Sequence, residues 1–227
     1  MPSLDLNVAK LREVNARLHA LPPGTNERAW TLANPEGRHS IAVGLDAPLD
    51  VTVAGHVGYY CGGMNKQASI TIEGHCGTGV GENIMSGTIR VRGNASQSAG
   101  ASGRGGLIVI EGDASARCGI SMKGVDIVVG GSVGHMSAFM AQSGRLVVCG
   151  DAGSDLGDSI YEAQIFVAGK VESLGADCEE QPMRSEDREA VAALLARAGI
   201  KADVKRFRRY GSARRLYNFH IDHVDQY

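Results

Sequence analysis

The sequence is poor in the features that identify common functional classes. It has no apolar run long enough for a membrane-spanning helix, and its first residues lack the basic and apolar regions of a secretory signal. The 23 lysines and arginines nearly balance the 25 aspartates and glutamates, so the charge gives no reason to expect a nucleic-acid or membrane partner. We therefore expect a cytoplasmic protein that binds neither nucleic acid nor membrane.

Motifs for catalysis are missing too. The chain has no nucleophile motif, no phosphate-binding loop that opens a helix, and no Cys-x-x-Cys pair. The glycine run from Gly74 to Gly81 superficially resembles a dinucleotide-binding fingerprint, but such a loop must open a helix, whereas these glycines belong to a repeat. We expect no catalytic, cofactor-binding or metal-binding residue in this chain.

What the sequence does contain is a strict repeat. A short apolar strand that ends in glycine recurs between residues 51 and 169, each copy nineteen residues after the last. The seven anchor glycines are Gly55, Gly74, Gly93, Gly112, Gly131, Gly150 and Gly169. Aliphatic residues stand two and four positions before each of them, which is the period of a strand with one face inward. A fixed period in this range is typical of a solenoid.

Nineteen residues are too few for a strand–helix–strand unit in every copy. We therefore predict an all-β fold, a parallel β-helix of seven coils with one such strand in each coil. Coils stacked at ~4.8 Å give a rod on the order of 30 Å long. We interpret the seven anchor glycines as corners of the coil, and the glycine or alanine seven residues after each of them as a second tight corner.

The repeat divides the chain into three parts. They are an N-terminal helix and connector (1–37), the β-helix (38–180), and a C-terminal helix with a basic tail (181–227). Apolar residues at helical spacing predict the first helix within residues 4–21, and residues 41–43 predict a first strand.

The last part begins with a second predicted helix. It starts at Ser185, a suitable N-cap, and stops at Gly199. The tail from 201 to 215 holds seven lysines or arginines. We expect this tail to be solvated or to dock on an acidic protein surface, rather than to bind RNA.

The outward face of the strands changes character along the rod. Three residues before the anchor it is Thr52, Thr71 and Arg90 in the early coils. In the later coils it is Val109, Val128, Val147 and Phe166. An outward strand face should be polar unless something covers it. Either a terminal segment of this chain or another subunit covers these four residues, which makes them the candidate partner interface.

Neither the cysteines nor the histidines predict a metal site. Cys61 and Cys118 share one repeat position but lie three coils apart, roughly 14 Å, which is too far for a disulfide or a shared metal. The other cysteines occupy three different positions, so we expect five free thiols, small and buried. His56 and His75 are neighbours on adjacent coils, and His220 and His223 form a second pair, but neither pair has the further ligands that a metal needs.

The spacing of the glycines carries a family resemblance. The pattern Gly-x-x-Gly-x-x-x-Gly occurs at Gly55, Gly58 and Gly62, again at Gly74, Gly77 and Gly81, and in part at Gly131 and Gly134. This pattern resembles the motif of the GXGXG domain. That domain is the C-terminal right-handed β-helix of the large subunit of glutamate synthase, and it also occurs in formylmethanofuran dehydrogenase. The resemblance covers about residues 38–180.

Free-standing chains of this kind resemble the β-helix subunit of N-methylglutamate synthase (methylamine–glutamate N-methyltransferase), and residues 211–222 are similar to that subgroup as well. The resemblance implies a non-catalytic scaffold subunit. It implies two partners, a glutaminase-type amidotransferase subunit and an FMN-binding subunit with an iron–sulfur cluster. Their joint reaction would convert glutamate and methylamine to N-methylglutamate, and no catalytic residue of the family falls in this chain.

Two alternatives stay open at this point. One is a subunit of an ordinary split glutamate synthase or of a formylmethanofuran dehydrogenase-like complex, because the resemblance does not decide between methylamine and ammonia. The other is an independent β-solenoid that associates with itself and acts as a binding module.

Overall fold

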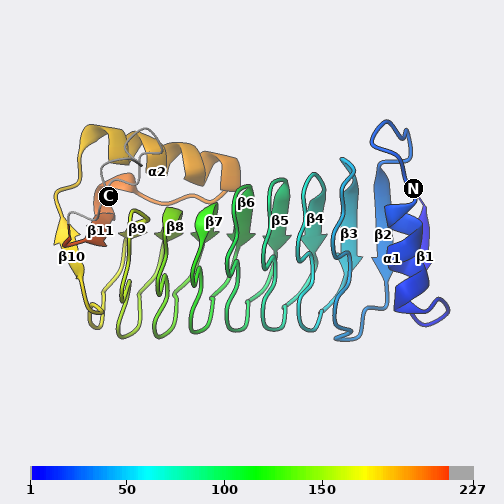
Figure 1. Cartoon of the computed structure of the whole chain (residues 1–227), viewed down its shortest axis with the longest axis horizontal. Helices are drawn as coiled ribbons and strands as arrows, with labels where there is room; N and C mark the ends of the chain where they lie inside the picture. Colours follow the sequence, from blue (N-terminus) through cyan, green and yellow to red (C-terminus); the bar gives the residue numbers. More distant parts are fainter. Residues whose placement is uncertain (1, 215–227) are drawn as a thin grey trace, which may run out of the picture.

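The computed structural model describes residues 2–214 and shows an all-β protein, a parallel β-solenoid (Figure 1). One strand from each regular coil lies in a single sheet: β3 (Asp50–Ala54), β4 (Ser69–Ile72), β5 (Thr88–Val91), β6 (Leu107–Ile110), β7 (Lys123–Val129), β8 (Ser143–Val148) and β9 (Gln164–Val167). Val51 pairs with Ile70 and Ile70 with Ile89, so the register advances nineteen residues per coil. The predicted fold class and period are confirmed, while the right-handedness that the resemblance implies stays a prediction.

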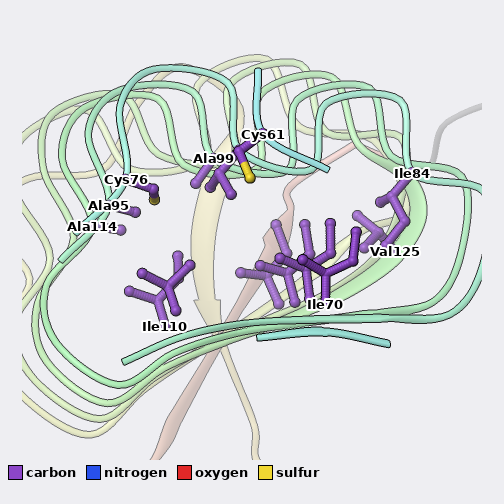
Figure 2. Close-up of a cluster of buried hydrophobic side chains, with 14 of the residues drawn as sticks. Cys61, Ile70, Cys76, Ile84, Ala95, Ala99, Ile110, Ala114 and Val125 are labelled. Atoms are coloured by element: carbon purple, nitrogen blue, oxygen red, sulfur yellow. The ribbon is translucent and has the colours of Figure 1, made fainter. Parts of the chain in front are cut away.

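A continuous apolar core fills the inside of the coils. Figure 2 shows Ile70 and Ile110 on the sheet, Cys61 and Ala99 on the opposite wall, and Ile84 and Val125 on a connecting wall, all pointing inward. Each of these six side chains is 0% exposed. Hydrogen bonds between coils are not confined to the sheet, since the N–H of Gly81 on the opposite wall donates to the carbonyl of Cys61 over 2.9 Å. Every coil is therefore bonded to its neighbours on more than one wall.

The anchor glycines serve a different purpose from the one predicted. Among the seven, only Gly55 has a φ in the left-handed range. The others are needed because adjacent coils approach closely: a Cβ added at Gly74 would lie 2.7 Å from His56 Nδ1 and 2.9 Å from the carbonyl carbon of Gly55. The left-handed corner stands seven residues later, at Gly62 and Gly81, where φ is 65° in both.

The N-terminal end extends further than the repeat suggested. β2 (Ala29–Ala33) adds parallel to β3, and β1 (Ser3–Asp5) adds parallel to β2. Trp30 pairs with Val51, an interval of twenty-one residues, so the nineteen-residue repeat does not detect this coil. The strand predicted at residues 41–43 is wrong, because these residues form a turn that places Ile41 in the core.

A helix closes the core at this end. α1 (Leu11–His19) is shorter than the predicted range, because the residues before it build β1 and a turn. Its Val14 and Leu18 are each 1% exposed and belong to the same apolar cluster as the interior of the coils. Figure 1 shows α1 beside β1 and β2, at the end of the rod. The apolar stripe of the helix thus covers surface that the first coil would otherwise expose.

The C-terminal end is closed by the chain's last described strand. β11 (Arg208–Ser212) lies antiparallel between β9 and β10 (Cys178–Gln181). Tyr210 on β11 is 2% exposed and belongs to the main core cluster. The expectation of a solvated or partner-bound basic tail is therefore corrected for this segment, which pairs with its own chain as far as Ser212.

Between β10 and β11 the chain forms α2 (Ser185–Ala198) and a short 3₁₀ helix (Val204–Arg206). Gly199 follows α2 with a left-handed φ of 64°, which ends the helix. Figure 1 shows α2 running alongside the C-terminal coils, from β10 towards β6. Neither α1 nor α2, the α-helices of the described chain, has the length and apolarity that a membrane span requires.

Candidate functional site

The candidate partner interface lies under the chain's own helix. Val109, Val128, Val147 and Phe166 are all 0% exposed. They form a second apolar cluster with Val191, Leu194, Leu195 and Ala198 of α2 and with Phe207. Of the two covers that the sequence left open, the structure shows the terminal segment of the same chain, so these four residues are not free to bind another subunit.

Charged contacts hold the C-terminal end of α2 beside this cluster. Arg90 Nη2 donates to the carbonyl oxygen of Ala198 over 2.8 Å, which places a cation at the C-terminus of the helix, where the helix dipole favours it. Asp126, 8% exposed, accepts two hydrogen bonds from Arg145 at 2.8 and 2.9 Å and lies 3.9 Å from Arg197 of α2. The outward column therefore turns from polar to apolar at Arg90 because the helix ends there.

A polar ladder runs along the rod one residue after each anchor glycine. Each side chain except that of the last member accepts a hydrogen bond from the backbone N–H of the next member, over 2.7 to 3.0 Å. The members are His56, His75, Asn94, Asp113, Ser132, Asp151 and Lys170. The sequence predicted only that this column faces water. Its role as a row of hydrogen-bond acceptors could have been found in the sequence, since every member except the last carries an acceptor atom close to the backbone.

The two histidines of the ladder do not converge on a common ligand. The rings of His56 and His75 stack in parallel, with centroids 4.9 Å apart and planes 3° from parallel. Each Nδ1 accepts a ladder hydrogen bond, so only the Nε2 atoms remain, and these point side by side. Within residues 2–214 no group of three or more His, Cys, Asp or Glu side chains could hold a metal ion. His220 and His223 lie outside the described residues.

The cysteines are free thiols, three of them buried, and none is paired. Burial raises the pKa of Cys76 and of Cys118 to about 12 in each case, and it raises the pKa of Cys61 further still. Thiolates are the nucleophiles and the metal ligands of cysteine chemistry, so these thiols are held in their inert form.

The polar ladder runs along the rod and repeats one contact from coil to coil. Such a row stabilises the stack of coils. The described chain is thus a β-solenoid whose coils are bonded to one another in the sheet and along this ladder.

Comparison with known proteins identifies the family of the chain. It is 58% identical over 229 aligned residues to Protein GlxC from Rhizobium meliloti (strain 1021), and the alignment covers 100% of both proteins. This chain therefore belongs to the same family as Protein GlxC. No protein-family model matches the sequence.

Proposed function

We propose that this chain is a non-catalytic scaffold subunit of a glutamate-synthase-related complex. It would hold a glutaminase-type amidotransferase subunit and an FMN-binding subunit in register for the conversion of glutamate and methylamine to N-methylglutamate. The β-solenoid fold, the glycine spacing from Gly55 to Gly81, and the full-length similarity to Protein GlxC support this proposal. A cytoplasmic location is part of it.

The observation that carries the proposal is the regular register from β3 to β9. Each strand pairs with the next at a nineteen-residue interval, apart from the pair Lys123 and Ser143 at the start of β7 and β8, and coils also bond to one another on the wall opposite the sheet. Such a rod resists bending, because bending would have to stretch hydrogen bonds on one wall or another. A spacer between two catalytic centres needs this stiffness, since small misplacements of reacting groups cost rate steeply.

The cofactors of the proposed complex belong to its other subunits. An iron–sulfur cluster takes cysteine thiolates as ligands. Cys61, Cys76 and Cys118 are 5% exposed or less, and burial raises their pKa values, so they are unsuited to that role. We accordingly propose that the cluster and FMN are held by the FMN-binding partner.

The exposed surface of the coils supports a second candidate function. The exposed side chains of the coils could instead mediate self-association of an independent β-solenoid. A subunit of an ordinary split glutamate synthase, or of a formylmethanofuran dehydrogenase-like complex, remains the alternative within the same family resemblance.

Affinity purification of the tagged full-length chain from its native cell tests the proposal. We expect a yellow complex with the absorbance of a flavin, containing an amidotransferase and an FMN protein, and more active with methylamine than with ammonia. Greater activity with ammonia would favour the ordinary glutamate synthase. A colourless rod that binds only further copies of itself would overturn the scaffold function.

A further inference from the structure

Exposed apolar side chains gather on one part of the coil. Of the six most exposed large hydrophobic side chains in the described chain, five stand four to eleven residues after an anchor glycine. They are Tyr59, Met64, Met85, Met140 and Tyr161, between 39% and 58% exposed. This stretch, which we call the far side, includes the wall from which Cys61 and Ala99 point inward opposite the sheet (Figure 2). The far side is thus distinct from the strand face that α2 covers.

One apolar group on the far side spans two adjacent coils. It consists of Ile120, Met136, Phe139 and Met140, which we call the far-side patch. Ile120 and Phe139 occupy the same repeat position on neighbouring coils, and the N–H of Ser121 donates to the carbonyl of Phe139 over 2.8 Å. Met140 is 39% exposed and the other three are half-buried. None of the four belongs to either buried hydrophobic cluster of the described chain.

Cations without ion-pair partners surround this patch. Arg104, Arg117 and Lys123 are exposed, and none of them forms an ion pair with another residue in the 2–214 range. Two carboxylates also lie near the patch, since Asp155 is 3.3 Å from His135 Nδ1 and Asp158 accepts a 2.7 Å hydrogen bond from Ser159, so three cations stand beside two carboxylates. The patch therefore has an apolar centre and a rim with excess positive charge.

We infer that the far-side patch is the docking surface for an acidic protein subunit, one that presents apolar side chains inside a rim of aspartates and glutamates. Charge complementarity selects this occupant: unpaired arginines and lysines attract carboxylates and repel cations. A second copy of the chain fits less well, since a two-fold contact would put the same patch, with its Arg117 and Lys123, on both sides of the interface. Methionines suit the centre, because their flexible side chains adapt to the shape of a partner.

The inference rests on the proposed function for the identity of the partner, which is the FMN-binding or the amidotransferase subunit. Both ends of the rod are closed by the chain's own α1 and β11, and α2 covers the late strand face. These elements leave open the far side, the polar ladder and the early strand face, and of these three surfaces the far side carries the exposed apolar side chains. A partner bound there would lie across the middle coils rather than at a tip of the rod.

The test is a binding titration with the purified FMN-binding and amidotransferase subunits of the same organism. The variant is the full-length chain with Arg117→Glu and Lys123→Glu, and the matched control carries Lys170→Glu and Lys201→Glu, two exposed lysines away from the patch. We expect the patch variant to weaken binding of one subunit by about tenfold or more, and the control to stay within about twofold. The affinity of the unaltered chain should also fall more steeply with added salt than that of the patch variant.

Hydrogen exchange on the same complex provides a second readout. Peptides covering residues 116–123 and 135–141 should gain protection on binding, whereas peptides from the polar ladder should not change. Equal binding by the patch variant and the control would overturn the inference and leave the scaffold function standing. If the unaltered chain binds neither subunit, the proposed function fails, and the docking surface fails with it.

Two further results would assign the patch to another occupant and so overturn the inference. One is a dimer of the free chain in light scattering that the Arg117→Glu and Lys123→Glu variant abolishes. The other is protection of residues 135–141 in the free chain that disappears when residues 215–227 are removed.

Discussion

At the scale of single residues, the polar ladder shows how a surface position can be fixed by a neighbouring coil. Asn94 Oδ1 accepts from the N–H of Asp113 over 3.0 Å, and Ser132 Oγ accepts from the N–H of Asp151 over 2.9 Å. Different residue types thus make one contact, because each can bring an acceptor atom to the same backbone donor. The ladder satisfies N–H groups that the sheet does not reach.

Removing one ladder acceptor should weaken the stack locally. We expect Asn94→Ala to lower the free energy of unfolding by about 1 kcal/mol, since the N–H of Asp113 loses its partner. Asn94→Ser should cost less, because serine fills this role at Ser132. Urea denaturation followed by circular dichroism measures both. Equal losses in the two variants would show that the hydrogen bond contributes nothing.

Because adjacent coils approach closely at the anchor glycines, a substitution there should reduce stability more than the loss of a ladder hydrogen bond. Gly74→Ala places a methyl group 2.7 Å from His56 Nδ1 and 2.9 Å from the backbone of Gly55, so we expect a loss of about 2 kcal/mol or more. Gly24→Ala is the matched control, because nothing lies within 4 Å of its added Cβ. Thermal unfolding of the two variants checks this. A stable Gly74→Ala protein would mean that the coils can separate there at little cost.

The buried thiols predict a loss of stability in alkali. Burial raises the pKa of Cys76 to about 12, so the folded chain keeps this proton while the unfolded chain releases it at about 8.5. The unfolded state gains from ionisation as the pH rises above that value, so the contribution of Cys76 to stability is full below it and falls by about 2 kcal/mol at pH 10. The Cys76→Ala variant should lack this loss, and alanine already occupies the same position at Ala95. Urea denaturation at pH 7 and pH 10 compares the two, and parallel losses would refute the assignment to this thiol.

At the scale of elements, the apolar stripe in the sequence of α2 explains why the helix lies on the later strands. The four apolar strand positions from Val109 to Phe166 need a cover, and the stripe of Val191, Leu194 and Leu195 provides it. The helix has only modest apolar surface elsewhere, so its attachment depends on this one face. Arg90 and Asp126 then fix where the helix lies along the rod.

Weakening that face should detach the helix before the rod unfolds. We expect Leu194→Ala to reduce the stability of α2 by about 2–4 kcal/mol, because Leu194 is 1% exposed against the strand cluster. Hydrogen exchange should rise in residues 185–198 and remain slow in β3 to β5. Glu189→Ala, on the exposed side of the same helix, is the control. Uniform loss of protection along the whole chain would show instead that helix and rod unfold together.

Particular elements show how far the sequence can predict this structure. The strands β3 to β9 could be located from their glycines and alternating aliphatic residues, because one face is buried in every coil. β2 could not, since its coil is two residues longer than the repeat. Residues other than glycine also adopt a left-handed backbone, such as Tyr60 and Met64 with φ of 60° and 54°. Their side-chain type does not predict this conformation. The apolar strand face of the later coils predicted that something covers it, but only the folded chain shows that α2 does so.

At the scale of the whole molecule, the regular register makes coils interchangeable. Removing His56–Gly74, a full nineteen-residue coil, joins Gly55 to His75 and restores every strand to the same face. We expect this shortened chain to fold and to unfold cooperatively. Removing one residue less, His56–Glu73, shifts the following chain out of step with the coil before it and should prevent folding. Circular dichroism and gel filtration distinguish the two, and an intact rod from both deletions would contradict a register-locked solenoid.

The closure of the C-terminal end by β11 has a consequence for the order of events during synthesis. α1 and the first coils leave the ribosome early, and each later coil can add to the one before it as it emerges, because coils contact only their neighbours. β11 comes some forty residues after β9, the strand that it covers. Until translation reaches Ser212, the growing rod ends in an open strand edge, and this interval is when a newly made chain is most exposed to joining another one by mistake.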